Sequence, residues 1–176
     1  LASKICRCFD CRQVLYEESM FDGQKVSKSR IITSVDYSMV SMEAFEIYAA
    51  NHDIHVMDFV LKLDAYSYYM MNLLDYLIGN TDRHWGNWGF LVDNRTNQPV
   101  RLFDLMDLNQ TFLAYDTPDG ANCMTTGNRK MSQREAAVEA VKKIGLNQRA
   151  EIKDEWFEGR EKEREMFWCR FGILKE

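Results

Sequence analysis

Six residues from Asp82 to Asn87, which read Asp-Arg-His-Trp-Gly-Asn, combine side chains that suit phosphate chemistry. They place a carboxylate and a carboxamide five residues apart, which is the spacing that phosphotransferases use between a catalytic base and a magnesium ligand. A carboxylate accepts the proton of an attacking hydroxyl, and an amide oxygen is a hard ligand for a divalent cation. A motif this short is weak evidence by itself, so its interpretation depends on the secondary-structure elements around it.

The segment before this loop predicts a helix in the centre of a lobe. Apolar residues recur there at helical spacing, with almost no charge between them, at Tyr66, Met70, Leu73 and Leu77. Gly79 then provides a helix stop. The loop would therefore leave the end of a buried helix, where Asp75 on the inner face could anchor it through hydrogen bonds.

Two short apolar runs after the loop predict a β-hairpin. Residues 88–92 and 100–103 flank a polar segment that is typical of a long turn. If the strands pair about Thr96, Asn87 lies opposite residues 104–107. The chain would thus return two carboxylates to the loop.

These groups match the needs of a magnesium ion that bridges nucleotide phosphates. Such an ion takes about two hard oxygen ligands from the protein and the rest from phosphate and water. Asn87 and either Asp104 or Asp107 would supply them. Asp82 is then left to accept the proton of an attacking hydroxyl.

At this point the sequence resembles the HipA-type serine/threonine kinases, whose signature is Asn-x-Asp-x-His-x-x-Asn followed by Leu-x-Pro-Leu-Tyr-Asp. The matching residues are Asn80, Asp82, His84, Asn87 and the run Phe103-Asp104-Leu105-Met106-Asp107. The run lacks the proline of the family pattern. Phosphatidylinositol kinases share the Asp-Arg-His-x-x-Asn core, so the sequence is also similar to them.

The resemblance implies an α+β, protein-kinase-like fold that is mainly a helical C-terminal lobe. Residues 1–36 would form a partial nucleotide lobe of a helix, a hairpin and a hinge near residues 32–36. Residues 37–176 would form the helical catalytic lobe. The implied activity is ATP-dependent transfer of a phosphoryl group, with ATP and Mg²⁺ or Mn²⁺ as cofactors.

Residue roles follow from the same resemblance. Asp82 would be the catalytic base, and Asn87 with Asp107 would bind both metal and cofactor. Asp104 is the alternative metal ligand, and Asn80 is assigned to cofactor binding.

Two further loop residues have two interpretations each. His84 would either take part in catalysis or brace the loop that aims Asp82. Arg83 would either contact phosphate or form an ion pair with a nearby carboxylate. Trp85 and Trp88 are expected to pack the loop against the lobe.

The front of the nucleotide lobe is absent from the sequence. A helix is expected over residues 2–9 and two strands over 13–17 and 25–33, around a turn at Asp22-Gly23. The glycine-rich phosphate cover and the strand lysine of a kinase precede such a helix, and neither is present. We therefore expect a fragment of a longer protein with little activity alone.

The C-terminal third predicts connections and helices without evident chemistry. Residues 108–130 occupy the place of a kinase activation segment. Ser132 and Glu135 form a capping box that opens a helix closed by Gly145. Further amphipathic helices are expected at 148–157 and 159–170, with Trp156, Phe157, Phe167 and Trp168 packed on the lobe.

Composition limits the classes of function. The net charge of −5 argues against a surface that binds nucleic acid directly. No apolar run approaches a membrane span and no secretory signal is visible, so a cytoplasmic location is expected. Cys6, Cys8 and Cys11 invite a zinc interpretation, but helical geometry would not make three sulfurs converge, and reduced thiols are expected.

The partner and substrate remain open on sequence alone. A protein serine or threonine hydroxyl is the favoured acceptor. A lipid headgroup is disfavoured because residues 108–130 offer only Arg129 and Lys130 to hold a phosphate. A different class is a kinase-like module that binds a partner protein, since HipA-type kinases resemble parts of pairs with a DNA-binding antitoxin.

Overall fold

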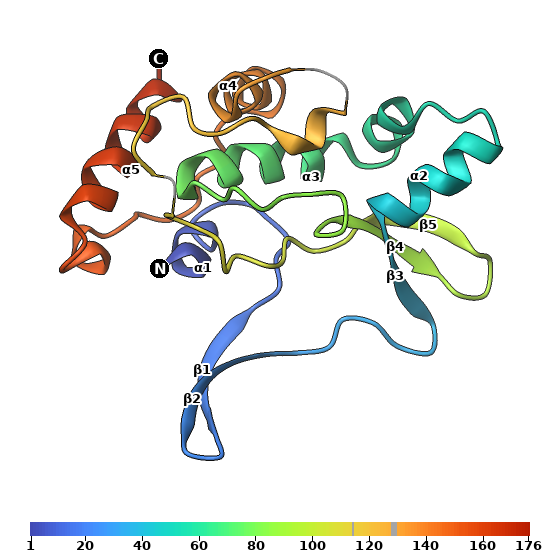
Figure 1. The fold of residues 1–176 in the computed structure, drawn as a ribbon, viewed down its shortest axis with the longest axis horizontal. Helices are drawn as coiled ribbons and strands as arrows, with labels where there is room; N and C mark the ends of the chain where they lie inside the picture. Colours follow the sequence, from blue (N-terminus) through green and yellow to red (C-terminus); the bar gives the residue numbers. More distant parts are fainter. Residues whose placement is uncertain (114, 128–129) are drawn as a thin grey trace.

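A computed structural model describes residues 1–113, 115–127 and 130–176 of the chain. The helices and helical turns are α1 (Ala2–Cys6), α2 (Met42–Asn51), α3 (Val56–Ile78), η1 (Met124–Thr126), α4 (Gln133–Ile144), η2 (Asp154–Phe157) and α5 (Glu161–Ile173). The strands are β1 (Tyr16–Phe21), β2 (Gln24–Ser29), β3 (Tyr37–Ser41), β4 (Gly89–Asp93) and β5 (Gln98–Leu102). Figure 1 shows α3 at the centre, with a small sheet toward one end and α5 at the other.

Helix α3 is the buried centre that the apolar spacing predicts. Residues 68–78 are buried without interruption, so this half of the helix has neighbours on every side. The helix begins at Val56 and has non-helical backbone at Asp64. The carboxylate of Asp64 accepts hydrogen bonds from the backbone N–H of Ser67 and of Leu102 and from Arg12. It thereby caps the second half of α3 and ties it to β5.

The expected hairpin after the loop is confirmed. Strands β4 and β5 pair antiparallel with Phe90 opposite Leu102, and β3 pairs with the other edge of β4, with Val40 opposite Phe90. Both strands lie within two residues of their expected bounds. The sheet places the residues after Leu102 beside the loop that precedes β4.

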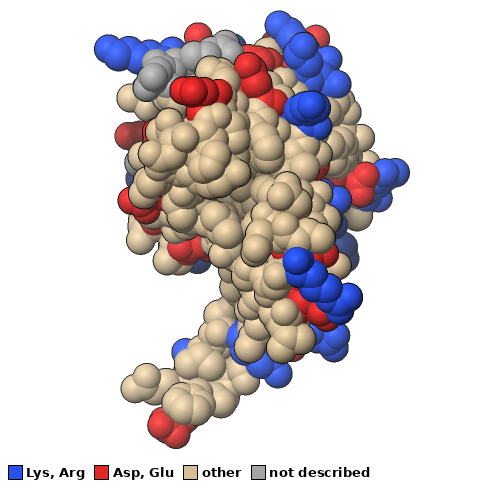
Figure 2. All heavy atoms as spheres, turned by 90° about the vertical axis from the view of Figure 1, so that its right-hand side faces the viewer, with Lys and Arg blue, Asp and Glu red and all other residues tan. Residues whose placement is uncertain are grey.

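The first hairpin, β1–β2, extends from the body as a narrow arm (Figures 1 and 2). Its turn lies at Asp22-Gly23 as expected, where both residues have positive φ. The strand bounds expected from the sequence were wrong, because both strands continue to the turn and Gln13 instead forms a bridge with Leu105. Helix α1 ends at Cys6, before the expected Phe9.

The C-terminal region differs from expectation in one segment. The capping box at Ser132 and the stop at Gly145 are confirmed for α4. Residues 148–153 form no helix and are held instead by tertiary contacts, in which the N–H groups of Arg149 and Ala150 donate to the carbonyl of Cys8. A tertiary backbone contact has thus outweighed local helix propensity. The aromatic residues of this region pack on the lobe as expected.

Arg129, weighed for lipid binding, lies outside the described residues. None of the described helices is both long and apolar enough to cross a membrane. The domain division after residue 36 and the cytoplasmic location stay predictions.

Gly79 allows the first stability prediction. It ends α3 with φ of 59°, and a β-carbon there would fall against the ring of Tyr115, whose hydroxyl donates to the carbonyl of Leu77. Gly79→Ala is therefore expected to lower the free energy of unfolding by roughly 2–5 kcal/mol, from left-handed strain and overpacking together. Urea denaturation measures this change.

Gly159→Ala is the matched control for this prediction. Gly159 also has positive φ, at 71°, but no atom lies within 4 Å of the position that a β-carbon would occupy there. Its replacement should lower the free energy of unfolding by only about 1–2 kcal/mol. Equal losses in the two variants would show that Tyr115 is not in contact with Gly79.

Candidate active site

The candidate site begins where α3 ends. Left-handed backbone at Gly79 turns the chain, and the N–H of Asn80 donates back to the carbonyl of Asp75 at 2.9 Å. This closes the last turn of the helix and directs residues 80–87 across its end. The loop is thus anchored to the most buried helix of the fold.

A buried ion pair holds the loop from inside. Arg83 donates through Nε to Asp75 Oδ2 at 2.8 Å and through Nη2 to Asp75 Oδ1 at 3.1 Å. Only 3% of Arg83 and 4% of Asp75 are exposed. Burial by itself would lower the pKa of Arg83, but the carboxylate of Asp75 outweighs it, so the pKa lies above its usual value. The expected anchoring role of Asp75 is confirmed.

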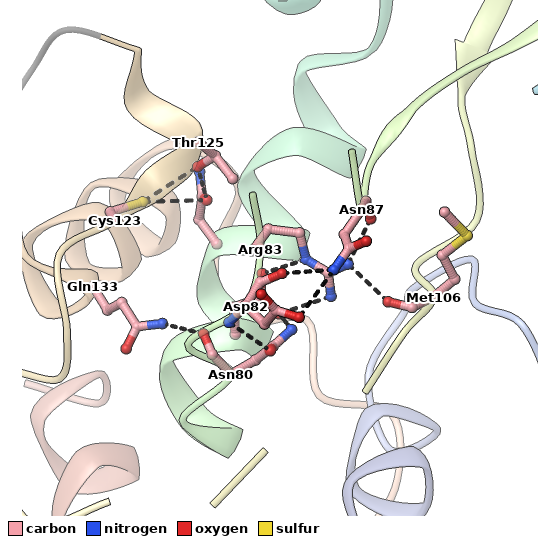
Figure 3. A network of polar contacts seen from close by, with 10 residues as sticks. Asn80, Asp82, Arg83, Asn87, Met106, Cys123, Thr125 and Gln133 are labelled. Atoms are coloured by element: carbon pink, nitrogen blue, oxygen red, sulfur yellow. Dashed lines mark hydrogen bonds and ion pairs between the residues drawn. The ribbon is translucent and has the colours of Figure 1, made fainter. Parts of the chain in front are cut away.

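The remaining donor of Arg83 joins the loop to the chain that follows the hairpin. Its Nη1 donates to the carbonyl of Asn87 at 2.8 Å and to the carbonyl of Met106 at 2.7 Å (Figure 3). One guanidinium therefore brings Asn87 close to the residue before Asp107. The ion-pair interpretation of Arg83 is confirmed, and its burial disfavours a contact with phosphate.

Asn80 is likewise buried and engaged within the protein. Its Nδ2 donates to Asp75 at 2.9 Å, and its Oδ1 accepts from the N–H of Asp82 at 3.2 Å. Gln133 at the start of α4 donates to the carbonyl of Asn80 at 2.6 Å. Asn80 thus shapes the loop from beneath, which disfavours direct contact with a nucleotide. The sequence did not indicate that Gln133 contacts this loop.

Asp82 and Asn87 face each other across the loop (Figure 3). The Nδ2 of Asn87 donates to the carbonyl of Asp82 at 2.8 Å and to its Oδ2 at 3.3 Å. These bonds orient the amide, so that its Oδ1 points away from Asp82. The Asp82 side chain is 41% exposed and is therefore accessible to a substrate.

His84 lies beside Asp82 on the outer side of the loop. Its Nδ1 accepts from the N–H of Gly86 at 3.0 Å, which requires the proton of a neutral ring to lie on Nε2. That Nε2 is 3.8 Å from Asp82 Oδ1. This geometry suits a residue that positions Asp82. Trp85 also packs the loop, because its indole N–H donates to the carbonyl of Met124 at 3.0 Å.

The two candidate carboxylates after the hairpin differ in their partners. Asp104 forms an ion pair with Arg101 at 2.5 Å. Asp107 has left-handed backbone, with φ of 54°, and its N–H donates to the hydroxyl of Tyr16 at 3.1 Å. Its side chain borders a cavity of about 460 Å³ between α1, the β1–β2 hairpin and the chain after β5. Asn87 and Asp104 line one small pocket, so the choice between Asp104 and Asp107 stays open, and the contact of Asp107 with Tyr16 was not foreseen.

The donor set fits a hard divalent cation. Asn87 offers an amide oxygen and Asp107 a carboxylate, and among the described residues neither oxygen has a hydrogen-bond donor. Oxygen donors of this kind suit Mg²⁺ or Mn²⁺. The described chain contains no cluster of three or more histidine, cysteine, aspartate or glutamate side chains placed to bind a metal ion, and its five cysteines are free thiols.

A central buried helix, a polar loop at its end and a hairpin that returns an aspartate define a kinase-like fold. Over 99% of its length the chain resembles the crystal structure of CtkA, a proinflammatory kinase of Helicobacter pylori, with a TM-score of 0.62, 14% identity and 77% of that chain covered. No protein-family model matches the sequence, and no curated protein does. At this identity the likeness shows the fold, while the HipA-type resemblance stays a prediction.

Proposed function

We propose that this chain is the catalytic part of an ATP-dependent kinase that phosphorylates serine or threonine hydroxyls of a protein. Asp82 is the base, Asn87 and Asp107 are the metal ligands, and His84 positions Asp82. One observation carries the proposal: the buried Asp75–Arg83 pair holds the loop and the Asp107 segment together. The likeness to a solved kinase supports it at the level of the fold.

The proposed reaction transfers a proton to Asp82 and the γ-phosphoryl group to the substrate hydroxyl. A carboxylate oxygen of Asp82 accepts the proton of the substrate hydroxyl as that oxygen attacks the γ-phosphorus of ATP. The bond from the γ-phosphorus to the bridging oxygen breaks, and its electron pair leaves with ADP. Magnesium would neutralise phosphate charge when held by Asn87 and Asp107. The amide of Asn87 also keeps Asp82 oriented through its Nδ2.

Metal-dependent nucleotide binding is the direct test. Because the protein supplies oxygen ligands to the metal and not to the phosphates, we expect the chain to bind ATP weakly, and only with Mg²⁺ or Mn²⁺ present. Isothermal titration calorimetry with and without the metal measures this. Equal affinity in both titrations would rule out the assigned ligands.

A second candidate is a kinase-like module that binds a partner protein, such as a DNA-binding antitoxin-like protein. The β1–β2 arm favours it, because Met20 and Phe21 near its tip are 61% and 69% exposed. A two-stranded arm with unpaired edges is stabilised by a covering surface. This candidate requires no metal-dependent nucleotide binding, so the same calorimetric titration separates it from the first.

A further inference from the structure

A groove is lined in part by the candidate catalytic loop but by none of the residues proposed to act as base or metal ligand. It has a volume of about 750 Å³ and lies between α2, the start of α3, η1 and α4. Trp85, which follows Asp82 by three residues on the loop, is among the residues that line the groove. The volume is too large for one side chain and matches a short stretch of peptide. A chain seated there would contact Trp85, which belongs to the same loop as Asp82.

The charge of the groove has one sign among its described lining residues. Glu46, Asp58 and Glu139 line it, whereas no described lysine or arginine does. Glu46 and Asp58 are both exposed, so their carboxylates are accessible to a bound chain. His55 also lines the groove, and its Nδ1 lies 3.1 Å from Asp58 Oδ2, so of these two exposed carboxylates only Glu46 has no ion-pair partner among the described residues.

This acidic line extends to the catalytic loop. Glu43 lies one turn before Glu46 on α2, and its N–H donates to the carbonyl of Trp85 at 3.0 Å. Its Oε2 is 3.7 Å from the position that a β-carbon on Gly86 would occupy. Carboxylates therefore run from the loop into the groove along one side of α2. In Figure 2, which faces this side of the molecule, acidic side chains lie on the upper part of the surface, with lysine and arginine side chains at its upper edges.

The walls of the groove add flat aromatic surface to these charges. The partly exposed indole of Trp85 lines it together with apolar residues of α3, whereas the rings of Tyr68 and Tyr69 are buried. The hydrogen bond from Trp85 to Met124 keeps its indole in place. A planar guanidinium both stacks on aromatic faces and pairs with carboxylates, whereas an ammonium group does only the second well. The lining thus distinguishes arginine from lysine.

We infer that this groove binds an arginine-containing segment of the protein substrate, close in sequence to the serine or threonine that is phosphorylated. The acceptor hydroxyl in this inference rests on the proposed function. Binding of the arginine segment in the groove does not depend on the proposed function, because it needs neither nucleotide nor metal. Glu46 is the principal carboxylate partner of the guanidinium, and Asp58 is the second.

The experiment uses three fluorescent peptides that differ at one position. Each contains a serine, and arginine, citrulline or lysine stands two residues before it. Citrulline has nearly the shape of arginine without its charge. Fluorescence anisotropy with the 176-residue chain, at low salt and without nucleotide, is expected to show affinity at least about tenfold weaker for citrulline and weaker for lysine. Equal affinities for arginine and citrulline would overturn the inference.

Variants assign the effect to the groove. Glu46→Gln should weaken binding of the arginine peptide by about three- to tenfold, and Glu46→Gln with Asp58→Asn more strongly. Neither should change binding of the citrulline peptide. Glu161→Gln, at an exposed position on α5 at the other end of the molecule, is the matched control and should bind like the parent chain. Unchanged arginine binding in the double variant would also overturn the inference.

The outcome is separable from that of the proposed function. The metal-dependent ATP titration tests the catalytic loop, and Glu46→Gln should leave it unchanged because Glu46 is not a metal ligand. Selective arginine binding without ATP binding would support the groove and reject the kinase. ATP binding with equal arginine and citrulline affinities would do the reverse.

Discussion

Asp82→Asn is expected to lower phosphate transfer by about 10²–10⁴-fold, because asparagine cannot accept the proton of the substrate hydroxyl. Nucleotide binding should stay nearly unchanged, since Asp82 is not assigned to the metal. The amide of Asn87 would still donate to the carbonyl of residue 82, so the loop keeps its shape. Turnover is measured with a protein substrate on a preparation whose parent activity has been established, and binding is measured by calorimetry.

Asp107→Asn is the companion variant that separates base from ligand. Loss of a carboxylate ligand should weaken metal-dependent ATP binding as well as turnover. Asp104→Asn should change both far less, because Asp104 is paired with Arg101. Wild-type turnover in Asp82→Asn would reject the mechanism, and a larger effect at Asp104 than at Asp107 would exchange their roles.

Asp75→Asn is expected to be the most destabilising single change near the site. It leaves the guanidinium of Arg83 charged and buried without its partner, and breaking such a pair costs about 3–5 kcal/mol. The guanidinium also donates hydrogen bonds to the loop and to the residue before Asp107, so ATP binding should weaken as well. Urea denaturation followed by tryptophan fluorescence measures the loss.

Asp36→Asn is the matched control, because Asp36 pairs with Arg95 on the surface. Its replacement should change the free energy of unfolding by less than about 1 kcal/mol. Adding Arg83→Met to Asp75→Asn should recover part of the stability, because the unpaired charge is removed. A loss below about 1 kcal/mol in Asp75→Asn would mean that the pair does not hold the loop.

Local sequence was enough to predict the elements that end or turn within a few residues. The stop at Gly79, the capping box at Ser132 and the turn at Asp22-Gly23 depend on backbone conformation and on bonds between near neighbours. The same holds for the hairpin after the loop. Its register followed from the turn, and the register brought the later aspartates back to Asn87.

Contacts between distant residues could not be predicted in this way. Residues 148–153 have helix-forming composition, but the carbonyl of Cys8, far away in sequence, takes two of their N–H groups. The break of α3 at Asp64 likewise depends on Arg12 and Leu102. No local sequence pattern predicts these hydrogen-bond partners, because they come together only when the distant segments pack.

In the candidate site, too, some properties of single side chains could be predicted from sequence and others depended on tertiary structure. The types and spacing of Asp82 and Asn87 were sufficient to predict what chemistry the loop could support. Tertiary structure decided that Arg83 is an internal clamp and that Asp104 is paired with Arg101. An arginine is charged in either role, so its type says nothing of its burial; only the position of Asp75 inside the fold determines which role it takes.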